Sequence, residues 1–299
     1  MQNRTKAYLA LLTTALIWGV APPIIKHSLN FVTPVEFLTI RFLIVSLIIF
    51  PFFILKLKKH PFEKKDWPLL LLVSLCGTSF TLGFIFWGLS KTSSLDSAVI
   101  VATAPLMIVF GGAVFLKEIV TGREKLGLGL AFLGTLVAVV SPVLNANGFS
   151  SQHSLSGNAL IFISNISWAA YSLLSKKLSK KYPSFNITAL SFFVGLISFL
   201  PLFFYQKSSN LFYINPQAWP AIIYMSTLGS IIAYFTYTYG VSLIEASEAT
   251  LFTYLQPIFT APLAVFWLKE TVSQYFIFGA ILIIIGVLLT SYKFKKEGR

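Results

Sequence analysis

Apolar runs of about 20 residues recur from one end of the 299-residue chain to the other, separated by short polar or basic segments. A helix of about 20 apolar residues is long enough to cross a bilayer. The pattern therefore predicts an all-α integral membrane protein with ten transmembrane helices. We place these helices at residues 8–27, 35–56, 68–89, 95–116, 124–144, 155–175, 186–205, 219–240, 246–268 and 274–292.

The first run is the least regular, because Pro22 and Pro23 interrupt it. With Arg4 and Lys6 as a positive flank, it also resembles a signal peptide. No small-x-small cleavage site follows it, and Trp18 has a counterpart in Trp168 of a later run. An uncleaved first transmembrane helix is the favoured interpretation.

Composition agrees with a membrane protein, since 56% of the residues are hydrophobic and 11% are charged. Soluble domains carry roughly 25% charged residues. The net charge of +13 comes mainly from loops that lie on one side when the N-terminus is placed in the cytoplasm. Cytoplasmic loops collect Lys and Arg, so this topology explains the charge without nucleic acid. We expect an inner-membrane protein with both termini in the cytoplasm.

The second half of the chain repeats the first. Pairs separated by 152 positions include Gly77/Gly229, Pro105/Pro257, Glu118/Glu270, Gly127/Gly279 and Gly134/Gly286. Upstream the separation is 150, as in Trp18/Trp168 and Arg41/Ser191. We expect a first repeat at 1–147 and a second at 148–299. Five helices in each unit is an odd number, so the two repeats must be inverted relative to each other, an arrangement found in secondary transporters.

Catalytic chemistry is not indicated by the sequence. The three histidines, His27, His60 and His153, are scattered, and no P-loop or Gly-x-Ser-x-Gly elbow occurs. We therefore predict no catalytic residues, no metal site and no cofactor. The acidic residues fall in loops, tails or first helical turns, so no proton relay is evident at a helix centre. Glu36 and Arg41, on one helix, are the candidates for gating or coupling, although Arg41 has the alternative of extending outward to the interface.

Pro105 and Pro257 fall near the middle of matching helices and predict paired helix breaks. A proline frees the carbonyl four residues earlier, here at Val101 and Thr253. Paired interruptions in two halves point to a transport site, although a simple packing kink is the alternative. Polar and aromatic side chains on neighbouring runs are the further candidates for substrate binding. The full candidate set is Trp18, Thr78, Thr81, Thr103, Asn165, Trp168, Tyr171, Tyr234, Tyr237, Thr253, Tyr254 and Gln256. Such a cavity, without a fixed central charge, suits a neutral or zwitterionic molecule with an apolar part.

These motifs resemble the drug/metabolite transporter superfamily, in its ten-helix EamA-type branch. The resemblance rests on Ile17-Trp18-Gly19, Arg41-Phe42, and Pro105 through Leu116-Lys117-Glu118, with their second copies at Pro257 and Leu268-Lys269-Glu270. It implies a central cavity between the halves, with the fifth and tenth helices peripheral. Members of the family export amino acids and related metabolites, or take up or extrude other small molecules, so the resemblance does not specify a substrate. Glu118 and Glu270 precede the helix-capping residues Thr121 and Ser273, so we interpret both acids as structural.

The sequence thus predicts a secondary transporter or facilitator that moves a small metabolite by alternating access, with amino acid export favoured. A passive channel, a drug or nucleoside transporter, and a membrane-embedded enzyme are the alternatives, the last of them without a catalytic motif. The expected partners are a small-molecule substrate and the lipid bilayer, and the expected assembly is a monomer or a weak homodimer.

Overall fold

The computed structural model describes residues 2–115, 122–145, 150–206, 214–243 and 250–291. Every regular element in those residues is helical, as predicted. The first half contains α1 (Gln2–Ser28), α2 (Pro34–Lys59), η1 (Lys64–Asp66), α3 (Trp67–Ser74), η2 (Leu75–Phe80), α4 (Thr81–Leu89), α5 (Ser94–Val101), α6 (Ala104–Phe115) and α7 (Gly122–Asn145). The second contains α8 (Ser150–Leu178), α9 (Ser184–Tyr205), η3 (Pro216–Ala218), α10 (Trp219–Tyr224), η4 (Met225–Ile232), α11 (Ala233–Leu243), η5 (Thr250–Leu255), α13 (Gln256–Pro262), η6 (Leu263–Trp267) and α14 (Gln274–Ser291).

Each of the ten predicted segments overlaps one or more of these helical elements. Six helical stretches in the described residues are long and apolar enough to cross a membrane, namely Arg4–Ser28, Pro34–Lys59, Lys64–Leu89, Ser94–Gly111, Ser184–Tyr205 and Pro216–Gly240. Lys125–Val140 and Gln274–Gly286 are shorter apolar helices. A count of ten crossings stays a prediction. The irregularity expected at Pro22 and Pro23 does not end the first helix, because α1 continues through both prolines.

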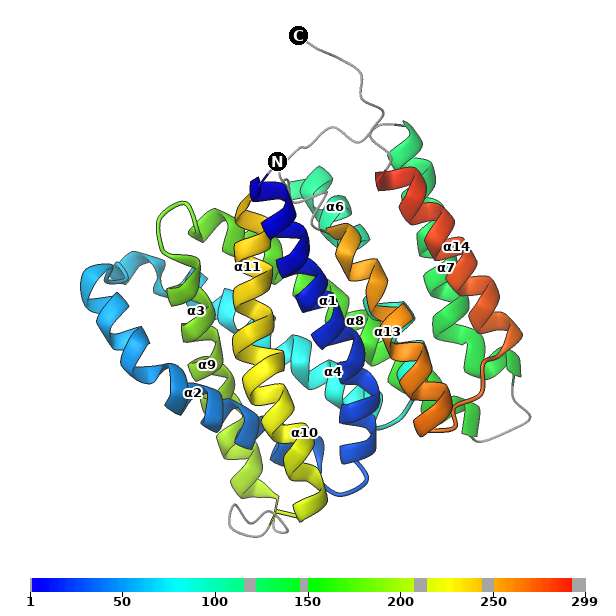
Figure 1. Cartoon of the computed structure of the whole chain (residues 1–299), viewed down its shortest axis with the longest axis horizontal. Coiled ribbons are helices and arrows are strands. Elements are labelled where there is room, and N and C mark those ends of the chain that lie inside the picture. Colours follow the sequence, from blue (N-terminus) through cyan, green and yellow to red (C-terminus); the bar gives the residue numbers. More distant parts are fainter. Residues whose placement is uncertain (1, 116–121, 146–149, 207–213, 244–249, 292–299) are drawn as a thin grey trace.

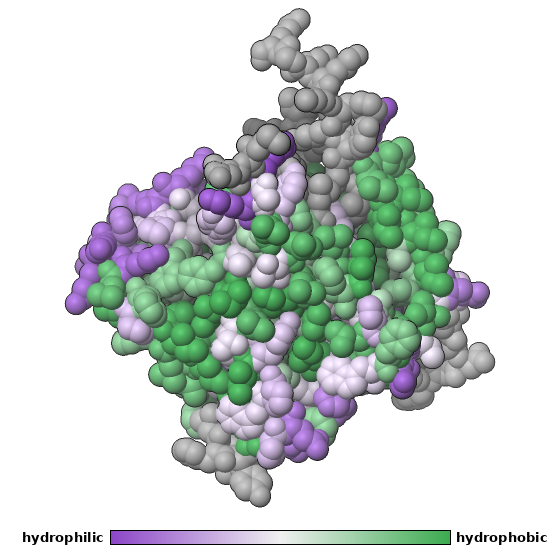
Figure 2. Space-filling model, in the orientation of Figure 1, coloured by the Kyte–Doolittle hydropathy of each residue, from purple (hydrophilic) through white to green (hydrophobic). Residues whose placement is uncertain are grey.

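The helices form a bundle in which α7 and α14 lie side by side at one edge, opposite the edge formed by α2 and α3 (Figure 1). The fifth and tenth predicted helices are therefore peripheral, as the resemblance implies. Figure 2 shows hydrophobic residues across the middle of the same face, with hydrophilic residues toward its upper-left and lower edges. Large apolar side chains such as Leu9, Leu47 and Leu288 are exposed. A broad exposed apolar surface is typical of a protein that contacts lipid.

Glycines allow α7 and α14 to approach closely. A Cβ on Gly134 would lie 2.7 Å from the carbonyl oxygen of Gly279, and a Cβ on Gly279 would lie 3.0 Å from that of Gly134. Gly286 is equally restricted by Gly127 and Ala131 of α7. Small residues at such contacts permit backbone-to-backbone packing in membranes. Because these glycines are equivalent positions of the two repeats, the α7–α14 contact is made by the same motif from both sides.

Hydroxyl-to-carbonyl contacts elsewhere in the bundle also occur in pairs that the repeat relates. Thr14 Oγ1 lies 3.3 Å from the carbonyl oxygen of Ala233, and Thr81 Oγ1 lies 3.5 Å from that of Ser164. Thr14 is the repeat equivalent of Ser164, and Thr81 is the equivalent of Ala233. The packing thus joins α1 to α11 in the same way as it joins α8 to α4. Each half is held mainly against the other half, so the space between them is defined by both repeats.

Both predicted helix breaks are present in the structure. The helix α5 ends at Val101 and α6 begins at Ala104, directly before Pro105. In the second half, the 3-10 segment η5 gives way to α13 at Gln256, directly before Pro257. Two π-helical segments, η2 and η4, also occupy equivalent positions around Gly77 and Gly229. Such segments are frequent at functional sites, because they interrupt the regular hydrogen-bond ladder.

Candidate substrate cavity

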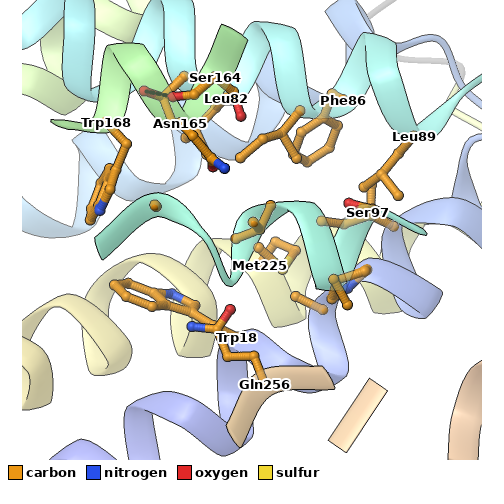
Figure 3. A pocket seen from close by; sticks show the side chains of 18 of the residues that line it. Trp18, Leu82, Phe86, Leu89, Ser97, Ser164, Asn165, Trp168, Met225 and Gln256 are labelled. Atoms are coloured by element: carbon orange, nitrogen blue, oxygen red, sulfur yellow. Dashed lines mark hydrogen bonds between the residues drawn. The ribbon is translucent and has the colours of Figure 1, made fainter. Parts of the chain in front are cut away.

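A cavity lies where α1, α2, α4, α5, α6, α8, η4, α11, η5 and α13 converge, so both halves contribute to its lining. It brings together nine of the residues that the sequence singles out. They are Trp18, Arg41, Thr81, Asn165, Trp168, Tyr234, Tyr237, Thr253 and Gln256. Figure 3 shows Trp18 and Gln256 on one side of the cavity and Asn165 and Phe86 on the other. The side chains that face the cavity are therefore far apart in the sequence and come from opposite repeats.

Aromatic rings form one end of this group. The ring centroid of Trp18 lies 6.1 Å from that of Trp168, 5.3 Å from that of Tyr234 and 5.6 Å from that of Tyr237. The indole nitrogen of Trp18 donates a hydrogen bond to the carbonyl oxygen of Gly229 in η4, at 3.0 Å. That bond satisfies the polar end of the indole inside an apolar interior and fixes the orientation of the ring.

The lining is symmetric in position but not in chemistry. Leu82/Tyr234, Ile85/Tyr237, Val101/Thr253 and Ala104/Gln256 are repeat-equivalent pairs, and both members of each pair line the cavity. In every pair the first half contributes the apolar member and the second half contributes the polar one. At these four pairs the first half therefore supplies apolar surface and the second half supplies hydroxyl and amide groups. A ligand with an apolar part and a polar part fits such a site.

Asn165 connects the cavity to the break in the first half. Its Nδ2 donates to the carbonyl oxygen of Ile100 at 2.6 Å and to Thr103 Oγ1 at 3.1 Å. The Thr103 hydroxyl is itself fully buried and donates to the same Ile100 carbonyl. Backbone groups exposed by a helix break must be satisfied by other groups at membrane depth. Thr103 and Asn165 do this here, so the break before Pro105 is stabilised by a residue of the second repeat.

Several predicted site residues do not line the cavity. Thr78 donates to the backbone carbonyls of Ser74 and Ser191, and the ring of Tyr171 covers Gly77. Tyr254 packs beside a separate apolar cluster that includes Val99 and Ile100. Pro105 and Pro257 shape the helix breaks, but their rings are not part of the lining. The substrate-binding role predicted for Thr78, Thr103, Tyr171 and Tyr254 gains no support from this placement.

Glu36, a predicted candidate for gating or coupling, has a local partner. Its Oε2 accepts a hydrogen bond from the Thr33 backbone nitrogen at 2.8 Å, and the Thr33 hydroxyl accepts one from the Glu36 nitrogen. This reciprocal pair is a capping box at the start of α2. No ion pair between Glu36 and Arg41 occurs in the described residues. A role in helix capping is sufficient to explain this carboxylate.

The position of Arg41 in the structure differs from what the sequence led us to expect. It is 1% exposed, which excludes the alternative that it extends outward to the interface, and it lines the cavity. Its Nε donates to the hydroxyl of Ser230 in η4 at 3.0 Å. The expectation of a cavity without a fixed central charge is therefore wrong. The sequence could not show this, because the orientation of Arg41 depends on how α2 packs against the opposite repeat.

Two further lining residues, which the sequence does not single out, are polar. Ser97 and Ser164 lie on α5 and α8, and the hydroxyl of Ser97 is buried with no hydrogen-bond partner in the described residues. Ser residues are common in membrane helices, so neither is conspicuous by type. The apolar lining residues Leu82 and Ile85 could have been predicted from the repeat, since they are the equivalents of the predicted Tyr234 and Tyr237.

A membrane-embedded helical bundle with a cavity between two repeats defines the class of multi-pass membrane transporters. The chain belongs to the EamA-like transporter family, whose model matches residues 5–140 and again residues 155–292. The match falls once in each predicted half. The resemblance to the drug/metabolite transporter superfamily is thereby confirmed, and membership indicates a transporter rather than an enzyme.

Relatives with similar sequences cover nearly the whole chain. An uncharacterized transporter of Archaeoglobus fulgidus is 28% identical over 97% of this chain and 98% of its own length. The uncharacterized transporter YyaM of Bacillus subtilis is 25% identical over 95% of this chain and 93% of its own. A crystal structure with 18% sequence identity superposes with a TM-score of 0.67 over 95% of this chain and 94% of that chain, which supports the fold.

Proposed function

We propose that this chain is a secondary transporter that moves a small zwitterionic metabolite, with amino acids as the leading class, outward across the cytoplasmic membrane. The observation that carries the proposal is the mixed lining of the central cavity. Leu82, Ile85 and Val101 offer apolar surface, and Tyr234, Tyr237 and Gln256 offer hydroxyl and amide groups. An amino acid with an apolar side chain needs both kinds of surface.

Alternating access is the mechanism that the packing supports best. Ten membrane crossings in two inverted repeats would let each half exchange roles with the other, so that the cavity opens to either side in turn. The reciprocal contacts of Thr14 with Ala233 and of Thr81 with Ser164 are those expected from such a pair. In this topology both termini are cytoplasmic, and the Glu270 loop faces outward.

The side chain of Tyr234 lines both the central cavity and a second cavity nearby. Tyr234 and Ser230 line this second cavity together with Ile49, Phe185 and Thr238, and Tyr234 also lines the first. In the proposed topology the second cavity lies nearer the cytoplasm. A continuous polar channel would not place bulky rings at this position, so the arrangement favours a gated carrier over a passive channel.

Counterflow in proteoliposomes tests the proposal. Liposomes that contain the purified protein are loaded with one unlabelled amino acid, and uptake of the same labelled amino acid is followed. Nucleosides and cationic drugs are tested in parallel, with and without a pH gradient. Saturable exchange of an amino acid supports the proposal. Exchange confined to nucleosides or drugs, or flux that does not saturate, contradicts it in favour of a different carrier or a channel.

A further inference from the structure

Arg41 is a buried cation with no ion-pair partner among the residues that the structure describes. It is the largest of the fully buried side chains, and its Cζ lies 6.0 Å from the ring centroids of Phe42 and Phe86. These rings give only weak electrostatic compensation. The single hydrogen bond found for the guanidinium is the one from Nε to the neutral hydroxyl of Ser230. Removing a charge from water without a paired partner is strongly unfavourable.

The unsatisfied part of the guanidinium belongs to a residue of the cavity lining. Nη1 of Arg41 is buried and has no hydrogen-bond partner in the described residues. The hydroxyl of Ser97, another lining residue, is likewise buried without a hydrogen-bond partner in the described residues. None of the described residues that line the cavity is acidic. Glu36, the acid nearest in sequence on the same helix, is engaged with Thr33. The described residues therefore supply no partner for this part of the guanidinium.

We propose that the central cavity is a carboxylate site, in which the guanidinium of Arg41 binds the carboxylate of the transported molecule. The planar guanidinium presents parallel N–H groups that match the two oxygens of a carboxylate. This inference rests on the proposed transport function and names the carboxylate as the group that the site recognises; free amino acids are one group of organic monocarboxylates. The apolar part of the ligand lies against Leu82, Ile85 and Phe86.

The same charge distribution disfavours amines that lack a carboxylate. A cationic ligand would share the cavity with Arg41 and find no acidic side chain among the described lining residues. The ammonium group of an amino acid has another location, because the faces of Trp18, Trp168 and Tyr237 are electron-rich and can contact a cation. We therefore expect the affinity for a ligand to depend mainly on its carboxylate and less on its amino group.

Binding to the purified wild-type protein tests the inference without a variant and without transport. The probes are phenylalanine, 3-phenylpropanoate, phenylalaninamide and 2-phenylethylamine, titrated against the tryptophan fluorescence of the full chain. Trp18 and Trp168 in the cavity make this signal sensitive to occupancy. We expect the two carboxylates to bind at least about 10-fold more tightly than the amide and the amine, as a charge-assisted pair requires. Equal affinities within the series, or no binding of either carboxylate, would overturn the inference.

Comparison of phenylalanine with 3-phenylpropanoate separates the two sources of the carboxylate. Tighter binding of phenylalanine supports an amino acid, and equal or tighter binding of 3-phenylpropanoate supports a simple organic acid. Either result is consistent with the carboxylate site. Failure of counterflow with intact carboxylate-selective binding would contradict the transport proposal alone. Saturable counterflow of amides and amines at the rate of carboxylates would contradict this inference alone.

Variants of Arg41 assign the selectivity to the guanidinium. We expect Arg41→Gln to reduce the carboxylate-to-amide preference to near unity and Arg41→Lys to retain part of it. Thr39→Val is the matched control, because Thr39 is a fully buried residue of the same helix that does not line the cavity. It should keep the wild-type preference. An Arg41→Gln protein that remains folded and keeps the preference would place the carboxylate elsewhere.

Discussion

Trp18 and Trp168, which occupy equivalent positions in the two repeats, meet edge to face at the central cavity with ring centroids 6.1 Å apart. Each ring also contacts Tyr234, at centroid distances of 5.3 Å and 6.2 Å. One residue duplicated with the repeat thus approaches its own copy across the boundary between the halves. Any movement of one half against the other must change the packing of these two rings.

Removal of the second ring should therefore impair transport. Trp168→Ala removes edge-on and tilted ring interactions with Trp18, Tyr171 and Tyr234, each worth about 0.5–1.5 kcal/mol. We expect the transport rate in proteoliposomes to fall at least about 10-fold, which corresponds to raising the activation barrier by roughly the energy of one such interaction. Trp219→Ala is the control, because Trp219 lies on the exposed surface of α10, and it should transport normally. Unchanged uptake kinetics in Trp168→Ala would remove this residue from the site.

The glycine contact between α7 and α14 should determine stability rather than substrate affinity. In Gly134→Ala the new Cβ would meet the Gly279 carbonyl oxygen at 2.7 Å, so the helices must separate. We expect a lower melting temperature in detergent with unchanged ligand affinity. Gly129→Ala on the same helix has no neighbour within 4 Å, so the higher helix propensity of Ala should leave it neutral or stabilise it by up to about 1 kcal/mol. Similar melting temperatures for the two variants would contradict the packing described.

A second prediction on stability concerns Glu270, which caps a helix of the opposite half. Its carboxylate accepts hydrogen bonds from the backbone nitrogens of Ser94 and Leu95, at 2.8 and 3.0 Å, and from the Ser94 hydroxyl at 2.9 Å. Glu270→Gln removes the charge from the N-terminus of α5 and should cost about 1 kcal/mol. Thermal unfolding measures the decrease in stability. Glu63→Gln, at an acid outside this cap, provides the comparison and should have the smaller effect.

An ionic cluster joins the loops of the two halves at the proposed cytoplasmic end. Lys181 Nζ lies 2.6 Å from Asp66 Oδ2 and 2.7 Å from Glu63 Oε2, and the Tyr182 hydroxyl donates to the same Asp66 oxygen. Hydrogen bonds from Lys181 and Lys65 lower the pKa of the Glu63 carboxyl below its usual value. The lowered pKa means that the folded protein stabilises the charged form of Glu63. The ion pair is therefore complete above the ordinary pKa of Glu and is lost as the pH falls through the lowered pKa.

Lys181→Met should therefore weaken the contact between the two halves at the proposed cytoplasmic end at neutral pH. We expect faster labelling of a cavity cysteine from the cytoplasmic side, and we expect high salt to have a similar effect on the wild type. Lys65→Met is the matched control, since Lys65 also pairs with Glu63 but belongs to the same loop. A rate increase of equal size in both variants would show that net charge, rather than the link between the halves, controls access.

The elements that local sequence determines were predictable. Apolar run lengths located the helical segments, and Pro105 and Pro257 located the breaks, because a missing N–H acts on its own helix. Trp18 and Trp168 were found through the repeat. The features that the sequence did not predict depend on packing between the halves. Glu270 appeared to serve only its own turn, where Ser273 indeed caps α14 by accepting from the Phe276 nitrogen, yet it caps α5. Glu118 and Thr121 lie outside the described residues.

Arg41 shows the same limit most clearly. Its depth along α2 was evident from the sequence, but whether it faced lipid, solvent or the cavity depended on the rotation of α2 against η4. Thr78 does not line the cavity for a related reason, because its hydroxyl donates to the Ser191 carbonyl of α9. Ser191 is the repeat equivalent of Arg41, and Thr78 is the equivalent of Ser230. The two repeats thus pair the same two positions, once with a charge and once without.

Access to the cavity from both sides of the membrane is the most direct measurement of the proposed mechanism. Val101→Cys places a thiol in the lining beside the first helix break, in a background where the buried Cys76 is replaced by Ala. A membrane-impermeant maleimide is applied to right-side-out and to inside-out vesicles, with and without a saturating substrate. We predict labelling from both sides, with the ratio of the two rates changed by substrate. Labelling from one side alone under every condition would contradict alternating access.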